Sequence, residues 1–220
     1  MTEGFRPTDL SIDQQLALRT AAVNLQREFE GVFGAETIEK FLHSSYDQFA
    51  NRASVPNFLP LLAERFARQR LTALARVEGK THDGKPVVLF LCTHNAGRSQ
   101  IALGYFQHLA GDNAVAWSGG SEPGEQVNPA AIAVMKEIGI DIGAEFPKPW
   151  TDEIVRAADV VVTMGCGDAC PVFPGKRYLD WELPDPNGLD VEQVRPIRDQ
   201  IEQKVRGLLH DLDVRVAEGA

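Results

Sequence analysis

Hydrophobic residues in the first 80 positions recur at the spacing of an amphipathic helix. One stripe follows positions i, i+4, i+7 and i+11 and consists of Leu18, Ala22, Leu25 and Phe29. A second consists of Ile38, Phe41, Leu42, Ser45 and Phe49, and a third of Leu59, Ala63, Phe66, Ala67 and Leu74. Such spacing gathers apolar side chains on one face of a helix. The pattern predicts a bundle of three helices whose stripes form its core, with dimerisation through them as a secondary alternative.

Turn-forming residues separate these helices and end the helical region. Gly31, Gly34 and the segment NRASVPN supply the turns. The third helix is expected to start between Pro56 and Pro60, because proline is tolerated in a first turn, and to end at the sequence EGK. The polar segment GKTHDGK, residues 79–85, then has the composition of a linker. We therefore predict a helical domain over residues 1–80 and a second domain over residues 86–220.

After residue 85 the pattern changes to short apolar runs that alternate with helical segments. Strands are expected at Val87–Leu91, Ala114–Ser118 and Val160–Met164, with a short fourth strand near Arg177–Leu179. Helices are expected at Ser99–Ala110, Pro129–Ile138, Thr151–Ala158 and Val191–Leu212. Alternating strands and helices are typical of a parallel sheet covered on both faces. The second domain is therefore predicted to be an α/β domain with a doubly wound, parallel, four-stranded sheet.

Charge and apolar run length restrict the partners of the chain. The net charge of −9 falls entirely in the second part, since residues 1–80 hold 10 basic and 10 acidic residues and residues 81–220 hold 12 and 21. This acidity argues against a nucleic-acid surface, and it requires any anion site to be built locally from backbone N–H groups and an arginine. The apolar runs are too short to span a membrane and no export signal is visible, so we expect a cytoplasmic protein without membrane contact.

The three cysteines are the main candidates for chemical activity in this sequence. Cys92, Cys166 and Cys170 are odd in number, which favours reactive thiols or a metal site over a disulfide scaffold. A zinc site at Cys166 and Cys170 would need two more ligands, and the histidines show no ligand-like pairing, so no metal is expected. The chain also lacks a glycine-rich nucleotide motif, so no cofactor is expected. Packing of the two later thiols in the interior is the remaining structural alternative.

The segment CTHNAGRS, which begins at Cys92, joins the first strand to the following helix. Ligands of such sheets bind beyond the carboxyl ends of the strands, where helix N-termini present free N–H groups. The segment is predicted to wrap a tetrahedral oxyanion while the guanidinium of Arg98 clamps two of its oxygens. The same positive field favours the thiolate form of Cys92. The predicted oxyanion-binding residues are Thr93, His94, Asn95, Ala96, Gly97, Arg98 and Ser99.

For three of these residues we predict individual roles. Ser99 can hydrogen-bond to the thiolate, and Gly97 allows a close backbone approach or a positive φ. His94 is expected to shape the loop or to face solvent rather than to act as a base. The alternative for Cys92 itself is a small buried cysteine at the end of a strand.

The pattern C-x5-R-S after a first strand, with the late Asp185-Pro186, resembles the low-molecular-weight protein tyrosine phosphatase fold over residues 86 to 213. The stretches CTHNAGRSQ, SEPGEQVNP, KPWTDEIVRAADVVVTMGCGDACP and DPNG more narrowly resemble arsenate reductases built on that fold. Longer members of that group also carry an N-terminal three-helix domain. The resemblance implies that Asp185 is a general acid and that Asn95 tethers the loop. A turn aspartate and a generic loop asparagine are the alternatives, because PDPNG is dense in turn formers.

The second and third cysteines separate a reductase from a phosphatase. A phosphatase hydrolyses its phosphoryl-cysteine with water, whereas arsenate must gain two electrons. A second thiolate can attack the Cys92 sulfur of an arsenate adduct, which releases arsenite and leaves a disulfide. Cys166 follows a strand parallel to that of Cys92, so both fall at the same sheet edge. Family resemblance implies that Cys170 then attacks Cys166 and that thioredoxin or a similar redoxin reduces the final disulfide.

The sequence therefore predicts an arsenate reductase that detoxifies arsenate. Two alternatives stay open at this point. One is a low-molecular-weight protein tyrosine phosphatase, and the other is a regulatory or binding module in which the fold senses an oxyanion. The combination of Cys92, Arg98 and Asp185 with Cys166 and Cys170 favours catalysis, because a sensor needs neither an acid nor a relay of thiols.

Overall fold

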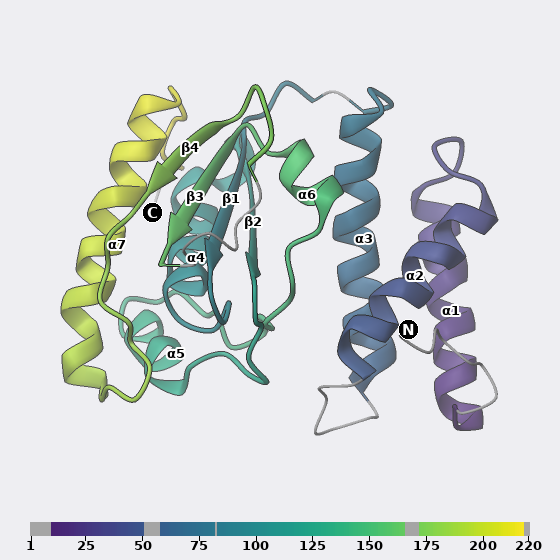
Figure 1. The fold of residues 1–220 in the computed structure, drawn as a ribbon, viewed down its shortest axis with the longest axis horizontal. Helices are drawn as coiled ribbons and strands as arrows, with labels where there is room; N and C mark the ends of the chain where they lie inside the picture. The colour runs from purple at the N-terminus through teal and green to yellow at the C-terminus, as the bar shows by residue number, and fades with distance from the viewer. Residues whose placement is uncertain (1–9, 51–57, 82, 166–171, 218–220) are drawn as a thin grey trace. The chain divides into compact units, whose positions relative to one another are not determined.

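The computed structural model describes residues 10–50, 58–81, 83–165 and 172–217. Contacts within the chain divide it into two compact units, Met1–Thr81 and His82–Ala220. Figure 1 shows helices in the first unit, and a sheet with flanking helices in the second. No helix in these described ranges is both long and apolar enough to cross a membrane.

The first unit contains the three predicted helices, α1 (Ile12–Glu28), α2 (Ala35–Ala50) and α3 (Leu59–Val77). Ser11 starts α1 with a capping box, since its side chain accepts from the Gln14 backbone while the Gln14 side chain accepts from the Ser11 backbone. Pro60 lies in the first turn of α3, where a missing N–H costs nothing. The helical prediction for this region is confirmed.

The cores of these helices differ from the predicted stripes at single positions. Ala21 rather than Ala22 is buried in α1, and Tyr46 is buried in α2, where Phe41 is only partly covered. Leu74 of α3 is also only partly covered. These differences arise because a helix buries an arc of its surface rather than an ideal line.

The second unit is built on a four-stranded sheet of β1 (Val87–Cys92), β2 (Val115–Gly120), β3 (Val160–Met164) and β4 (Arg177–Asp180). The strand order is β2-β1-β3-β4, and every neighbouring pair is parallel. The register sets Cys92 opposite Gly120 on one side and Met164 on the other. The predicted α/β fold is therefore confirmed, including the short fourth strand. Cys92 lies at the carboxyl end of a central strand, flanked on both sides.

Helices cover the two faces of this sheet. Side chains of α4 (Arg98–Ala110), α5 (Pro129–Lys136) and α7 (Val191–Asp211) form one core with the β1 and β3 residues Val88, Phe90, Val160 and Val162. The short helix α6 (Asp152–Ala157) contacts β1 and lies on the other side of the sheet (Figure 1). A 3-10 turn at Gly111–Asn113, which the sequence pattern did not predict, joins α4 to β2.

Ion pairs fasten α5 to α7 on the surface of this unit. Arg195 approaches Glu137, just beyond α5, at 2.8 Å, and Arg198 reaches the same carboxylate at 3.2 Å. The hydrogen bond from Arg195 holds the pKa of Glu137 below its usual range. These contacts restrain the carboxyl end of α5, while the amino end of that helix faces the carboxyl edge of the sheet.

Candidate active site

The thiol of Cys92 lies where β1 ends and the following loop begins. Its side chain is buried, and Sγ is 3.0 Å from the hydroxyl of Ser99 in the first turn of α4. The Asn95 carboxamide nitrogen donates to the same hydroxyl oxygen at 2.9 Å. Because the Ser99 oxygen already accepts from Asn95, its single proton can be donated to the cysteine sulfur. This arrangement orients the Ser99 hydroxyl toward the cysteine sulfur.

The loop after Cys92 turns its carbonyl groups toward a neighbouring segment. The backbone N–H groups of Glu122, Gly124 and Asn128 donate to the carbonyls of residues 93, 94 and 96 at 2.8–2.9 Å. Within the described residues, the backbone N–H groups of positions 94–99 have no acceptor. A run of unengaged N–H groups at the start of a helix is an anion-binding arrangement. The loop thus has the donors that a tetrahedral oxyanion requires.

Arg98 supplies the positive charge of this loop. Its buried guanidinium donates to the Asp185 carboxylate at 2.9 Å and to the Leu183 carbonyl at 3.5 Å. Gly165, just after β3, packs against it so closely that a Cβ there would lie 2.8 Å from the guanidinium, and its φ of +75° also favours glycine. The arginine is therefore held in one orientation by β3 and by the loop that carries Asp185.

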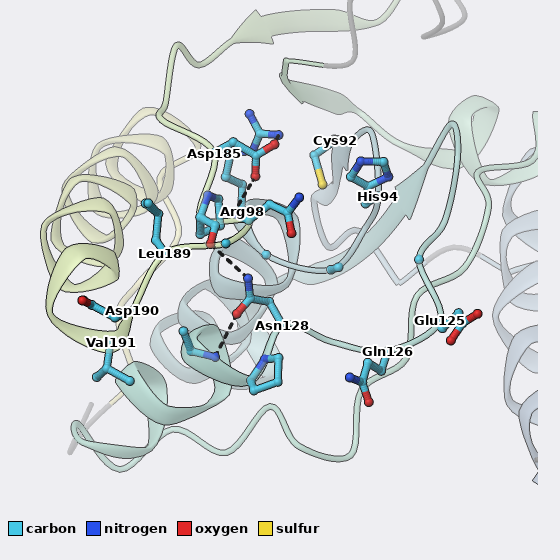
Figure 2. Close-up of a pocket in the computed structure, with 18 residues that line it drawn as sticks. Cys92, His94, Arg98, Glu125, Gln126, Asn128, Asp185, Leu189, Asp190 and Val191 are labelled. Carbon is cyan, nitrogen blue, oxygen red and sulfur yellow. Dashed lines mark hydrogen bonds and ion pairs between the residues drawn. The ribbon is translucent and has the colours of Figure 1, made fainter. Parts of the chain in front are cut away.

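Asp185 is fixed at the pocket by contacts of its own loop. Its carboxylate accepts from the Asn187 backbone at 3.0 Å, as in an Asx turn. The following Pro186 packs on the nucleophile loop, where a Cβ on Gly97 would approach its ring to 2.5 Å. Asn128 donates to the Pro186 carbonyl at 3.1 Å (Figure 2). A side chain at position 97 would therefore clash with the loop that carries Asp185.

These residues surround a single pocket of about 860 Å³ at the carboxyl edge of the sheet. In Figure 2 the sulfur of Cys92 and the paired side chains of Arg98 and Asp185 lie on one side of the pocket, and Leu189 and Val191 line another part. Of the predicted residues, the structure brings together Cys92, His94, Ala96, Gly97, Arg98 and Asp185 as pocket lining.

Three other predicted residues, Thr93, Asn95 and Ser99, do not line the pocket. Asn95 and Ser99 are buried behind the loop, and the Thr93 hydroxyl donates to the Gly165 carbonyl at 3.0 Å. A ring nitrogen of His94 is 3.0 Å from the Glu122 carbonyl, a contact suited to shaping the loop. Cys166 and Cys170 lie outside the described residues. Among the residues described, no group of His, Cys, Asp or Glu side chains could hold a metal ion.

The sequence reasoning missed three residues that support the loop. Gln100 donates to the Asn95 carbonyl at 3.0 Å, and Asn128 tethers Pro186 while its own side-chain oxygen caps α5. The backbone of Lys148, a buried residue, donates to Asn95 at 3.0 Å. Asn128 could have been found as an N-cap residue before Pro129. Nothing local to Lys148 signals its burial, because that depends on long-range packing.

Comparison with known proteins shows the family to which this chain belongs. Residues 87–218 match the family model of low molecular weight phosphotyrosine protein phosphatases. The protein belongs to this family. Residues 18–75 additionally match the model of the protein-tyrosine-phosphatase-like N-terminal domain. The predicted family resemblance is thereby confirmed for both parts of the chain.

Several proteins to which the chain is similar are named arsenate reductases. The chain is 38% identical over 130 residues to arsenate reductase 1 of Staphylococcus epidermidis, a match covering 57% of this chain and 97% of that protein. It is 39% identical over 132 residues to the arsenate reductase of Halalkalibacterium halodurans, covering 56% and 94% of the two chains. Among solved structures, the thioredoxin-dependent arsenate reductase of Corynebacterium glutamicum is 44% identical, with a TM-score of 0.82 over 91% of this chain and 98% of that chain.

Proposed function

We propose that the protein is a thioredoxin-dependent arsenate reductase that uses Cys92 as its nucleophile. The observation that carries the proposal is the pairing of the Cys92 thiol with a loop of unengaged N–H groups and Arg98 in one pocket. The likeness to the Corynebacterium glutamicum enzyme, which extends over both units, supports arsenate as the oxyanion and thioredoxin as the reductant.

In the first step the Cys92 thiolate attacks the arsenic atom of bound arsenate. The N–H groups of the loop and Arg98 hold the arsenate oxygens, so Arg98 shifts part of its bonding from Asp185 to the substrate. Asp185, in its protonated form, gives its proton to the departing oxygen, which leaves as water. The product is an arsenate ester of the Cys92 sulfur, in which arsenic is still pentavalent.

In the second step a thiolate at Cys166 attacks the Cys92 sulfur. The sulfur–arsenic bond breaks, its electron pair stays on arsenic, and arsenite leaves while a Cys92–Cys166 disulfide forms. Cys166 follows Gly165 directly in the sequence, and the Gly165 carbonyl accepts a hydrogen bond from Thr93 of the nucleophile loop. The residue that precedes Cys166 is therefore in contact with the loop that follows Cys92.

The third step returns the nucleophile to its thiol form. Cys170 attacks Cys166, so that the Cys92 sulfur leaves as a thiolate and a Cys166–Cys170 disulfide remains. Two electrons from reduced thioredoxin then open this disulfide, which balances the two electrons gained by arsenic. A low-molecular-weight thiol with its redoxin is the competing reductant, since a relative from Synechocystis, 35% identical over 125 residues, is named a glutaredoxin arsenate reductase.

The deciding experiment is arsenate-dependent oxidation of NADPH by the full chain with thioredoxin and thioredoxin reductase. We expect turnover that is abolished in Cys92→Ser and in Cys166→Ser. Replacing thioredoxin with glutathione and glutaredoxin identifies the reductant. The phosphatase alternative predicts no arsenate turnover and hydrolysis of an aryl phosphate that needs Cys92 and survives Cys166→Ser.

A further inference from the structure

Lys148 is 3% exposed, and it is the one buried lysine in the described part of the chain. It lies between α5 and α6 and does not line the pocket around Cys92. Lysine is rarely buried unless its ammonium group is paired, because removing that charge from water costs several kcal/mol. A lysine in such a place therefore has a structural or functional reason to be there.

The ammonium group of Lys148 contacts its own chain segment. Nζ lies 3.4 Å from the Phe146 carbonyl oxygen and 3.5 Å from the Glu145 carboxylate. It also lies 4.7 Å from the centroid of the Phe146 ring, within the range of a cation–π contact. All these partners precede Lys148 by two or three residues, so the ammonium group folds residues 145–148 back on themselves.

The folded segment contacts the nucleophile loop through its backbone. The Lys148 N–H donates to the side-chain oxygen of Asn95 at 3.0 Å, and the Phe146 carbonyl accepts from Gln100 at 3.3 Å. The Lys148 carbonyl accepts from Gly120, at the end of β2, at 2.9 Å. The segment thus joins β2, the first turn of α4 and the nucleophile loop in one network.

Asn95 is the point at which this network reaches the thiol. It is fully buried and has a φ of +46°, a conformation that needs support from its surroundings. With its oxygen accepting from the Lys148 backbone, its amide nitrogen faces Ser99 and donates there. Ser99 in turn contacts the Cys92 sulfur.

We propose that Lys148 is a positioning residue for the nucleophile, whose buried ammonium group shapes residues 145–148 so that their backbone orients Asn95 toward Ser99. Lys148 does not line the pocket around Cys92 and acts through Asn95. The proposal deepens the proposed function, because it assigns a residue to the preparation of the Cys92 thiolate. It concerns the thiol alone and can be tested without arsenate turnover.

The test measures the rate of Cys92 alkylation by iodoacetamide against pH in the full chain with Cys166→Ser and Cys170→Ser. We expect Lys148→Met to slow alkylation at neutral pH by about tenfold or more, since small displacements of a reacting group cost such factors. The matched control is Lys136→Met, which removes an exposed lysine of the same unit and should change the rate by no more than about twofold. Sulfate binding, measured by calorimetry, should weaken in Lys148→Met but not in the Lys136→Met control.

A double-mutant cycle with Asn95→Ala distinguishes positioning from general damage. If Lys148 acts through Asn95, the Lys148 substitution has no further effect on the alkylation rate once Asn95 is alanine. Should Lys148→Met fail to fold, Lys148→Arg takes its place in the same cycle. Independent effects of the two substitutions, or an alkylation rate in a folded Lys148→Met variant equal to that of the control, would overturn the proposal. If the chain shows no arsenate turnover but the double-mutant cycle gives the expected result, the proposed function is contradicted and the role of Lys148 stays supported.

Discussion

Ser99 joins the reactive sulfur to the residues that support it. It is fully buried, its oxygen accepts from Asn95, and its proton is available to the Cys92 sulfur 3.0 Å away. A hydrogen bond to a charged group contributes about 1.5–3 kcal/mol. The Ser99 hydroxyl is therefore expected to contribute to the reactivity of the Cys92 thiol.

Replacing Ser99 with alanine should lower the rate of Cys92 alkylation at neutral pH by about 10- to 100-fold, because the thiolate loses a donor. The rate at high pH, where the thiol is ionised in any case, should approach that of the unmodified chain. The measurement is the alkylation rate against pH. Ser118→Ala is the control, since Ser118 on β2 is also buried but its hydroxyl has no hydrogen-bond partner among the described residues. Equal rates for the two variants at neutral pH would contradict this role of Ser99.

Asn128 connects three elements around the pocket with one side chain and its backbone. Its oxygen accepts from the N–H groups of residues 130 and 131 and caps α5, while its nitrogen donates to the Pro186 carbonyl beside Asp185. Its backbone N–H donates to the Ala96 carbonyl of the nucleophile loop. The cap and the tether use different atoms of the carboxamide, so they can be separated by substitution.

Asn128→Asp keeps the cap and removes the tether, because a carboxylate accepts from N–H groups but cannot donate to the Pro186 carbonyl. We expect its free energy of unfolding to stay close to that of the unmodified chain, whereas arsenate turnover falls by about tenfold as the Asp185 loop shifts. Asn128→Ala loses both and should also lose about 1 kcal/mol of stability. Urea unfolding and steady-state kinetics give the two readouts. A turnover defect in Asn128→Ala that Asn128→Asp does not share would show that the tether is dispensable.

The elements of the second unit were predictable because their patterns are local. Hydrophobic runs and turn residues located all four strands and the helices within a few residues, and the segment from Cys92 to Ser99 predicted an anion site. The contacts that support the nucleophile loop were harder to predict from the sequence. The Lys148–Asn95 hydrogen bond joins residues 53 positions apart, and the Gly97–Pro186 packing depends on where a distant loop returns. Such contacts follow from tertiary packing, which a periodic pattern along the chain does not encode.

At the scale of the whole molecule, the pocket around Cys92 lies in one of the two units. The curated relatives from Staphylococcus epidermidis and Halalkalibacterium halodurans align with little more than half of this chain, yet 97% and 94% of their own lengths are covered. A relative of that extent has no counterpart of the helical unit. Every described residue of the pocket around Cys92 also belongs to the second unit. The chemistry of arsenate reduction is therefore expected to be complete within residues 82–220.

A chain of residues 82–220 should accordingly fold and reduce arsenate with a kcat/KM within about threefold of the full chain at saturating thioredoxin. Its fold is supported by its own core and by the short relatives, so circular dichroism and urea unfolding serve as the control. Light scattering of the two chains tests the homodimer predicted from the helical stripes, which would be lost with the first unit. If the shortened chain is folded but inactive, the helical unit must supply a residue to catalysis or to thioredoxin recognition. If the shortened chain is active and the two chains differ only in oligomeric state, the first unit acts in assembly and the reductase activity resides in the second unit.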